Sequence, residues 1–124
     1  MRLLALDQSS RVSGYAIFID GKLETYGKID LKQEDVGERL VIFRRKVSEL
    51  IADYDIDEIA FEDIYMDGKK VNNVSTFKVL AEVFGICDEL FTELNIKNTA
   101  VLAGTWKSSL GIKGTTRPEQ KKNA

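Results

Sequence analysis

Two acidic residues stand directly after apolar runs in this chain of 124 residues. Asp7 follows the run Leu3–Leu6, and Glu62 follows Ile59–Phe61. A carboxylate in such a position costs free energy unless it is paired or bound to a metal. If both runs are parallel neighbouring strands, their ends lie about 4.8 Å apart, and the two carboxylates can share metal ions that promote an in-line phosphoryl displacement. The structural alternative is that Asp7 caps a turn over residues 8–11 and that Glu62 meets a lysine.

The composition narrows the possible chemistry. The sequence contains no histidine, which excludes histidine-based triads, histidine general bases and imidazole metal ligands. Cys87 is the single cysteine, which excludes a disulfide framework and a cysteine-rich zinc site. A metal would therefore be held by oxygen, as Mg²⁺ and Mn²⁺ are. No apolar run reaches the ~20 residues of a membrane span, and no signal peptide is evident. We expect a cytoplasmic protein with no membrane partner.

The charge is distributed unevenly along the chain. Residues 1–103 carry 13 Lys and Arg against 19 Asp and Glu, a net charge of −6, whereas residues 104–124 carry five against one, a net charge of +4. This asymmetry suggests one face for cations and another for phosphates, although a solvated, lysine-rich tail is the alternative. Thr116–Gln120 is typical of a helix start, and the chain ends at Ala124. We expect a single domain over residues 1–124 that lacks its C-terminal helix through truncation.

The N-terminal third predicts an antiparallel meander. Arg2–Asp7 is typical of a buried strand, and Val12–Ile19 is rich in β-branched and aromatic residues. Asp20-Gly21 is a two-residue hairpin signal, because both positions favour a positive φ. The chain then returns as a more polar strand over Lys22–Leu31, which we place near an edge of the sheet.

The remainder alternates helices and strands. A stripe at helical spacing predicts the first helix; its residues are Val36, Leu40, Phe43, Val47, Leu50 and Tyr54. A buried strand over Glu58–Ile64 follows, in which Asp63 must point away from Glu62 and is structural. We expect a second helix near Asn73–Leu94 and a strand over Thr99–Ala103. This order indicates an α/β fold with a mixed five-stranded sheet, a meander plus parallel strands, and helices on both faces.

The second helix carries two apolar stripes and therefore needs two partners. One partner is its own sheet. The other stripe predicts a homodimer interface, and its residues are Val79, Val83, Ile86 and Leu90. The alternative is that this stripe is buried within one domain.

Several segments resemble the RuvC family of Holliday-junction resolvases. Residues 6–16 (LDQSSRVSGYA) resemble the first motif of the family, and residues 59–65 (IAFEDIY) resemble the second. Residues 74–85 are similar to the helix that follows, and residues 106–122 to a basic segment. Gln8 and Ser9 replace the proline and glycine of the first motif, which predicts a looser turn. Two further metal-binding residues of the family would lie beyond Ala124, so we expect this chain alone to be inactive, and the divergent turn is more like phage enzymes.

The resemblance implies an RNase H-like, metal-dependent endonuclease that nicks four-way or branched DNA as a homodimer during recombination. Asp7 and Glu62 would be catalytic ligands of Mg²⁺ or Mn²⁺, and Lys107 and one of Lys121 and Lys122 would lie near the scissile phosphate. Tyr65 would stack on an unpaired base, unless it is a core aromatic. The remaining DNA-binding candidates would hold backbone phosphates, with a solvated position as the alternative for the loop residues; they are Arg11, Lys69, Lys70, Asn72 and Asn73.

Three other functions are compatible with some of these sequence features. Actin-like ATPases and sugar kinases also place an Asp at a strand end before small residues, but they need two such domains. A YqgF-type nuclease would share the fold and act on RNA. A catalytically incomplete domain would dimerise and bind branched DNA without cutting it. Metal-dependent cleavage of branched DNA would distinguish a nuclease from a domain that only binds such DNA.

Overall fold

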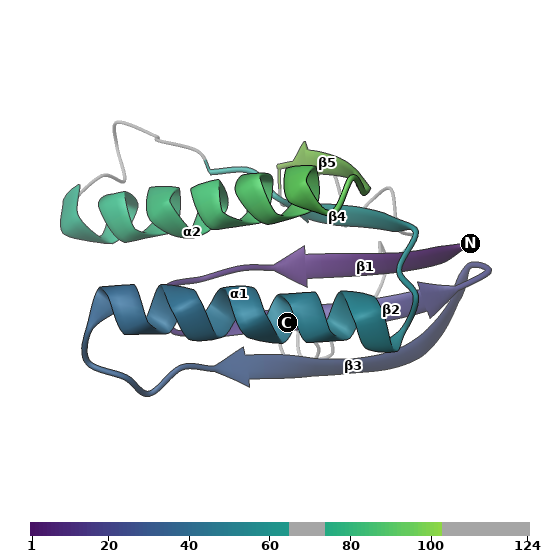
Figure 1. The fold of residues 1–124 in the computed structure, drawn as a ribbon, viewed down its shortest axis with the longest axis horizontal. Coiled ribbons are helices and arrows are strands. Elements are labelled where there is room, and N and C mark those ends of the chain that lie inside the picture. Colours follow the sequence, from purple (N-terminus) through teal and green to yellow (C-terminus); the bar gives the residue numbers. More distant parts are fainter. Residues whose placement is uncertain (65–73, 103–124) are drawn as a thin grey trace.

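The computed structural model describes residues 1–64 and 74–102, and it contains a five-stranded sheet in the order β3-β2-β1-β4-β5 (Figure 1). The strands are β1 (Arg2–Asp7), β2 (Val12–Ile19), β3 (Lys22–Asp30), β4 (Glu58–Glu62) and β5 (Lys97–Val101). The first three pair antiparallel, whereas β4 runs parallel to β1 and β5 runs parallel to β4. The predicted mixed sheet, a meander followed by parallel strands, is confirmed.

The boundaries of the meander follow the local sequence closely. Asp20 and Gly21 have φ angles of 52° and 82°, as the predicted two-residue hairpin requires. β3 lies at the edge of the sheet, where its polar side chains are exposed to water. The parallel strands are less well predicted at their ends, since β4 stops at Glu62 and β5 begins at Lys97.

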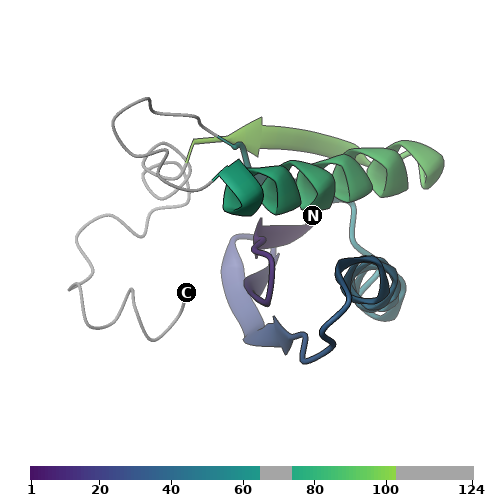
Figure 2. The ribbon, with the colours of Figure 1, turned by 90° about the vertical axis from the view of Figure 1, so that its left-hand side faces the viewer.

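Two described helices, α1 (Val36–Asp53) and α2 (Val74–Glu93), cover the same face of the sheet, which curls around them (Figure 2). Helices on both faces were predicted. The shared face follows from topology, because the crossovers β3-α1-β4 and β4-α2-β5 step across the sheet in the same direction, and right-handed crossovers then place both helices on one side. Neither described helix has the length and hydropathy of a membrane span.

The core fills the space between this face and the two helices. Alternate residues of the central strands point into it, among them Leu4 and Leu6 of β1 and Phe61 of β4. The ring of Phe61 lies 5.2 Å from those of Phe84 and Phe91, centroid to centroid. Burying each such side chain contributes about 1.5–3 kcal/mol. Because the side chains of a strand alternate, the residues between these core positions must point to the opposite face.

The second apolar stripe of α2 contributes to this same core, and the prediction that it forms a dimer interface is wrong for its two fully buried residues, Val83 and Leu90. Val83 and Leu90 are 2% and 1% exposed, and Val79 and Ile86 are partly buried against the same cluster. The second partner of α2 is α1, which lies beside it on the same face of the sheet. For these residues the alternative of burial within one domain therefore holds, and the sequence pattern did not indicate that α1 is the element that covers them.

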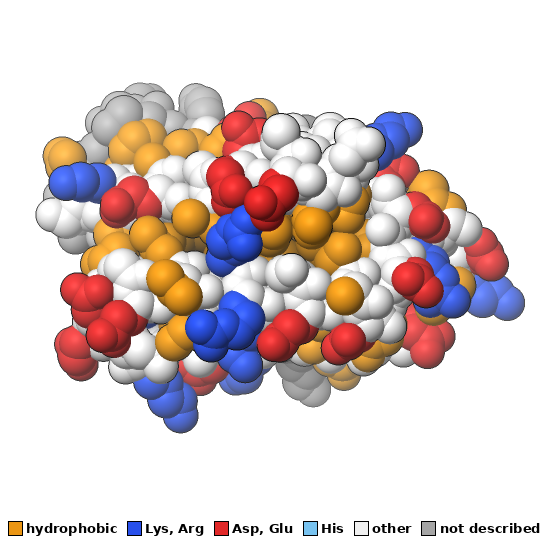
Figure 3. Space-filling view, in the orientation of Figure 1, with side chains coloured by type: hydrophobic (Ala, Val, Ile, Leu, Met, Phe, Trp, Pro, Cys, Tyr) orange, Lys and Arg blue, Asp and Glu red, His pale blue; other side chains and the backbone are white. Residues whose placement is uncertain are grey.

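An ion pair crosses the outer side of the contact between the helices. Arg44 of α1 donates from Nε to Glu89 of α2 at 2.9 Å and also pairs with Glu93. Acidic and basic side chains meet between the two helices on this surface (Figure 3). The Arg44 guanidinium holds the pKa of the Glu89 carboxyl below its usual value. The pair is exposed, so its contribution to stability is small.

Candidate active site

Asp7 and Glu62 close two neighbouring parallel strands at the same edge of the sheet. The register pairs Ala5 with Ala60 and Leu6 with Phe61, so the next step along both strands brings Asp7 beside Glu62. Leu6 and Phe61 face the helices, and alternation therefore directs both acidic side chains to the opposite face. The predicted adjacency of the two strand ends is confirmed.

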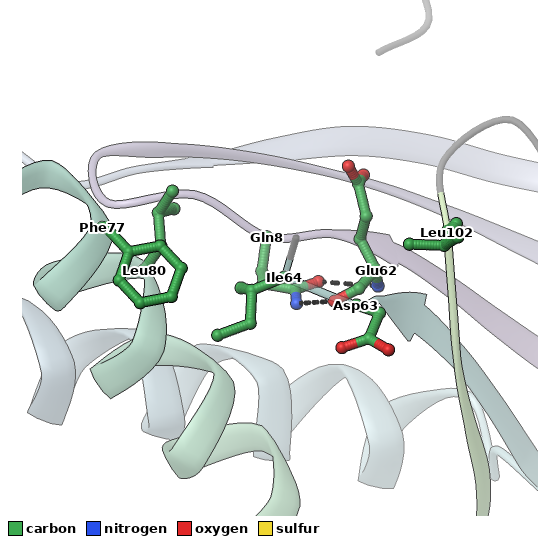
Figure 4. A pocket seen from close by; sticks show the side chains of 7 residues that line it. All are labelled: Gln8, Glu62, Asp63, Ile64, Phe77, Leu80 and Leu102. Carbon is green, nitrogen blue, oxygen red and sulfur yellow. Dashed lines mark hydrogen bonds between the residues drawn. The ribbon is translucent and has the colours of Figure 1, made fainter. Parts of the chain in front are cut away.

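Asp63 points away from this pair. Figure 4 shows the carboxylates of Glu62 and Asp63 on opposite sides of the chain at the end of β4. The backbone N–H of Asp63 donates to the carbonyl of Val101 at 2.8 Å, which continues the contact between β4 and β5. The predicted orientation of Asp63 is thus confirmed.

The Asp7 carboxylate does not cap the turn that follows it. Ser13, which is fully buried, holds that turn instead: its Oγ accepts from the Ser9 N–H at 2.8 Å and lies 3.4 Å from the Ser9 carbonyl. Within residues 1–64 and 74–102, no side chain bonds or pairs with Asp7, which is partly exposed. Its carboxylate is consequently available to an external ligand, and the capping alternative is wrong.

Gln8 links the two strand ends through its side chain. Its Nε2 donates to the backbone carbonyl of Glu62, and its Oε1 accepts from the backbone N–H of Glu62 at 3.1 Å. The side chain is 8% exposed. With Ser13, this contact holds the turn in place, and a turn looser than that of the family stays a prediction. Sequence reasoning treated Gln8 only as a departure from a motif, because a glutamine in a turn gives no signal of its partner.

An open pocket of about 520 Å³ lies beside this link (Figure 4). Its wall joins the ends of β4 and β5 to the first turns of α2; the lining residues are Gln8, Glu62, Asp63, Ile64, Phe77, Leu80 and Leu102. The sequence did not indicate Phe77, Leu80 or Leu102 as site residues.

Most of the other predicted site residues lie outside the described part of the chain. Arg11 is the exception: it is exposed on the turn after β1, and its carbonyl accepts from the Leu31 N–H at 2.8 Å. The residues outside the described ranges are Tyr65, Lys69, Lys70, Asn72, Asn73, Lys107, Lys121 and Lys122.

The donor set fits a divalent metal ion in part. Asp7 and Glu62 offer carboxylate oxygens, the ligands that Mg²⁺ and Mn²⁺ favour. In the described ranges, no group of three or more Asp, Glu, His or Cys residues is placed to hold a metal, so these two carboxylates would need further oxygen ligands. Cys87 offers no alternative chemistry, because burial raises the pKa of its thiol to about 12.

Comparison with known proteins provides independent evidence about the family of this chain. The family model described as crossover junction endodeoxyribonuclease RuvC matches residues 3–104. The chain is 28% identical to a RuvC endodeoxyribonuclease of Helicobacter hepaticus, over 95% of this chain and 75% of that protein.

Two solved structures are similar in fold. RuvC of T. thermophilus in complex with a Holliday junction substrate superimposes with a TM-score of 0.74, at 15% identity, over 90% of this chain and 70% of that chain. A Thermus thermophilus RuvC structure gives a TM-score of 0.71, at 19% identity, over 97% of this chain and 75% of that chain.

Proposed function

The chain belongs to the RuvC family of crossover junction endodeoxyribonucleases, and on this premise we propose that Asp7 and Glu62 are its catalytic carboxylates. Its function is that of the family, structure-selective cleavage of Holliday-junction DNA. The observation that supports the assignment of the two acids is their position on one face, at the ends of adjacent parallel strands. Both acids lie within the segment that the family model matches.

The family is metal-dependent, and we propose Mg²⁺ or Mn²⁺ as the ion. Bound divalent cations would stabilise the negative charge that develops on the attacking and leaving oxygens of the phosphodiester. Asp7 and Glu62 would bind the ions and orient them toward the DNA, and additional oxygen ligands would come from outside the described residues. The partly exposed position of Asp7 suits a ligand that must meet DNA from solvent.

The other predicted contacts follow the resemblance to the family. We propose that Arg11, exposed beside the site, binds a backbone phosphate of the junction. Lys107 and one of Lys121 and Lys122 would supply positive charge near the scissile phosphate, and Tyr65 would stack on a base near the crossover. Further phosphate contacts are proposed for Lys69, Lys70, Asn72 and Asn73.

A synthetic four-way junction tests the proposed function. The full-length protein is expected to nick this junction symmetrically in Mg²⁺ or Mn²⁺, to leave a linear duplex of the same sequence intact, and to stop cutting when EDTA is added. Equal cutting of duplex and junction, or cutting that persists in EDTA, would contradict the proposal. If the protein binds the junction but does not cut it in either Mg²⁺ or Mn²⁺, a branched-DNA-binding domain would be favoured. If it cuts an all-RNA junction but not the DNA junction, a YqgF-type activity would be favoured.

Symmetric nicking needs two active sites, so we also propose a homodimer. Val83 and Leu90 of the second stripe are buried in the core of one chain, but the first turns of α2 retain accessible apolar side chains. Val74 is 70% exposed, and Phe77 and Leu80 are partly exposed on the wall of the open pocket. We propose that this surface meets its copy in a second subunit.

Phe77→Asp is expected to weaken the dimer by at least about tenfold in dissociation constant, because it places a charge in an apolar contact. Light scattering across a dilution series measures the shift, and circular dichroism verifies that the variant is folded. Val41→Asp, at a 58% exposed position of α1, is the control and should leave the dimer unchanged. A Phe77→Asp protein that dimerises like the wild type would place the interface elsewhere.

A further inference from the structure

The backbone pairing between β1 and β4 ends one step before the two candidate ligands. Leu6 and Phe61 are the last registered pair, and after Asp7 the chain turns away toward β2. At this point the backbone N–H and C=O of Glu62 face the end of β1, where the pairing of β1 with β4 has stopped. Peptide groups near a partly buried site must find other partners.

The Gln8 side chain supplies both partners. A primary amide carries one carbonyl and one NH₂ group, so it can pair with a peptide as another peptide would. Gln8 does so on one side of Glu62, by accepting from its N–H and donating to its carbonyl. On the other side, the N–H of Asp63, which belongs to the same peptide group as the Glu62 carbonyl, donates to the Val101 carbonyl of β5 at 2.8 Å. The backbone of Glu62 is thereby held from both directions.

The turn that carries Gln8 is itself held in place. Ser13 is fully buried and accepts from the Ser9 N–H at 2.8 Å. Gln8 is also the residue next to Asp7 in sequence. Any displacement of its amide would therefore change the position of Glu62 relative to Asp7.

We propose that Gln8 is a positioning residue that sets the relative placement of the two candidate metal ligands. It acts through the backbone of Glu62 and not through contact with metal or DNA. This inference rests on the proposed function, in which Asp7 and Glu62 bind the catalytic ions. Groups that orient metal ligands in this way typically contribute about 10–100-fold to metal affinity.

Gln8→Met keeps the length of the side chain and removes both hydrogen bonds. We expect the Mg²⁺ concentration for half-maximal junction cleavage to rise about tenfold or more, with the rate at saturating Mg²⁺ recovering toward that of the wild type. Without DNA, Mn²⁺ binding followed by electron paramagnetic resonance should weaken by a similar factor. Junction binding in EDTA should be unchanged, because the DNA-binding surface is not altered.

Two further variants sharpen the test. When ionised, the side chain of Gln8→Glu can still accept from the Glu62 N–H but cannot donate to the Glu62 carbonyl. This variant should therefore also raise the Mg²⁺ concentration needed for cleavage. It replaces Gln8→Met in the test if that variant fails to fold. Gln33→Met makes the same change at a glutamine before α1 whose side-chain oxygen has no hydrogen-bond partner in the described ranges, and it should behave as the wild type.

The outcomes separate this inference from the proposed function. Wild-type metal dependence and Mn²⁺ binding in a folded Gln8→Met or Gln8→Glu protein would overturn the positioning role, even if the variant melts at a lower temperature. If Asp7→Asn then abolishes cleavage and weakens Mn²⁺ binding, the proposed function stands without the inference. If Asp7→Asn binds Mn²⁺ and cuts normally, the proposed function itself fails.

Discussion

Asp7→Asn is expected to abolish junction cleavage in the full-length protein while junction binding and folding persist. The substitution preserves the shape of the side chain and removes the negative charge that would hold a cation. Loss of one group that stabilises transition-state charge costs about 10²–10³-fold in rate, and we expect a loss of at least that size at saturating Mg²⁺. Asp7 has no side-chain partner within the described ranges, so stability should change by no more than about 0.5 kcal/mol.

Asp63→Asn is the matched control for this experiment. Asp63 adjoins Glu62 but points to the opposite side of β4 (Figure 4), so removal of its charge should leave the cleavage rate near that of the wild type. Cleavage rates come from single-turnover assays on a labelled junction, and binding comes from gel shifts in EDTA. Near-normal cutting by Asp7→Asn would remove Asp7 from the reaction. An Asp63→Asn variant as impaired as Asp7→Asn would place the chemistry on the helical face.

The elements of the fold were predictable because each has a local cause. The apolar runs Leu3–Leu6 and Ile59–Phe61 form buried strands, and Asp20-Gly21 forms the hairpin that needs two positive φ angles. The meeting of Asp7 and Glu62 was also predictable, because parallel neighbouring strands have their carboxyl ends at the same edge of the sheet. The positions of the two acids at strand ends, together with the order and direction of the strands, were sufficient to predict this part of the site.

The link made by Gln8 was not predictable, because it depends on register. Its amide reaches Glu62 only because the β1–β4 pairing stops at Leu6 and Phe61, and a shift of one residue would remove the contact. The partner of the second α2 stripe was missed for a related reason. Helical periodicity indicates which faces are apolar, but the element that covers each face is decided by the handedness of both crossovers.

Val83→Asp is expected to destabilise the fold strongly, although the sequence alone suggested that it would separate subunits. Val83 is 2% exposed within the cluster that joins α1, α2 and the sheet. The variant forfeits about 1.5–3 kcal/mol of apolar burial and adds a carboxylate with no designed partner in an apolar site. Among single substitutions, changes of this kind are the ones that lower the free energy of unfolding by more than about 4 kcal/mol. The total free energy of unfolding of a native protein is about 5–15 kcal/mol.

Urea unfolding followed by circular dichroism measures this loss, and Val41→Asp provides the comparison. Both variants place the same carboxylate on a helix, but Val41 is 58% exposed on α1, so its midpoint should stay close to that of the wild type. The two helices share one core, so Val83→Asp should lower the unfolding midpoint of the whole described domain in a single transition. A Val83→Asp protein that keeps the wild-type midpoint and becomes monomeric would restore the stripe as a subunit interface and refute the assignment of α1 as its partner.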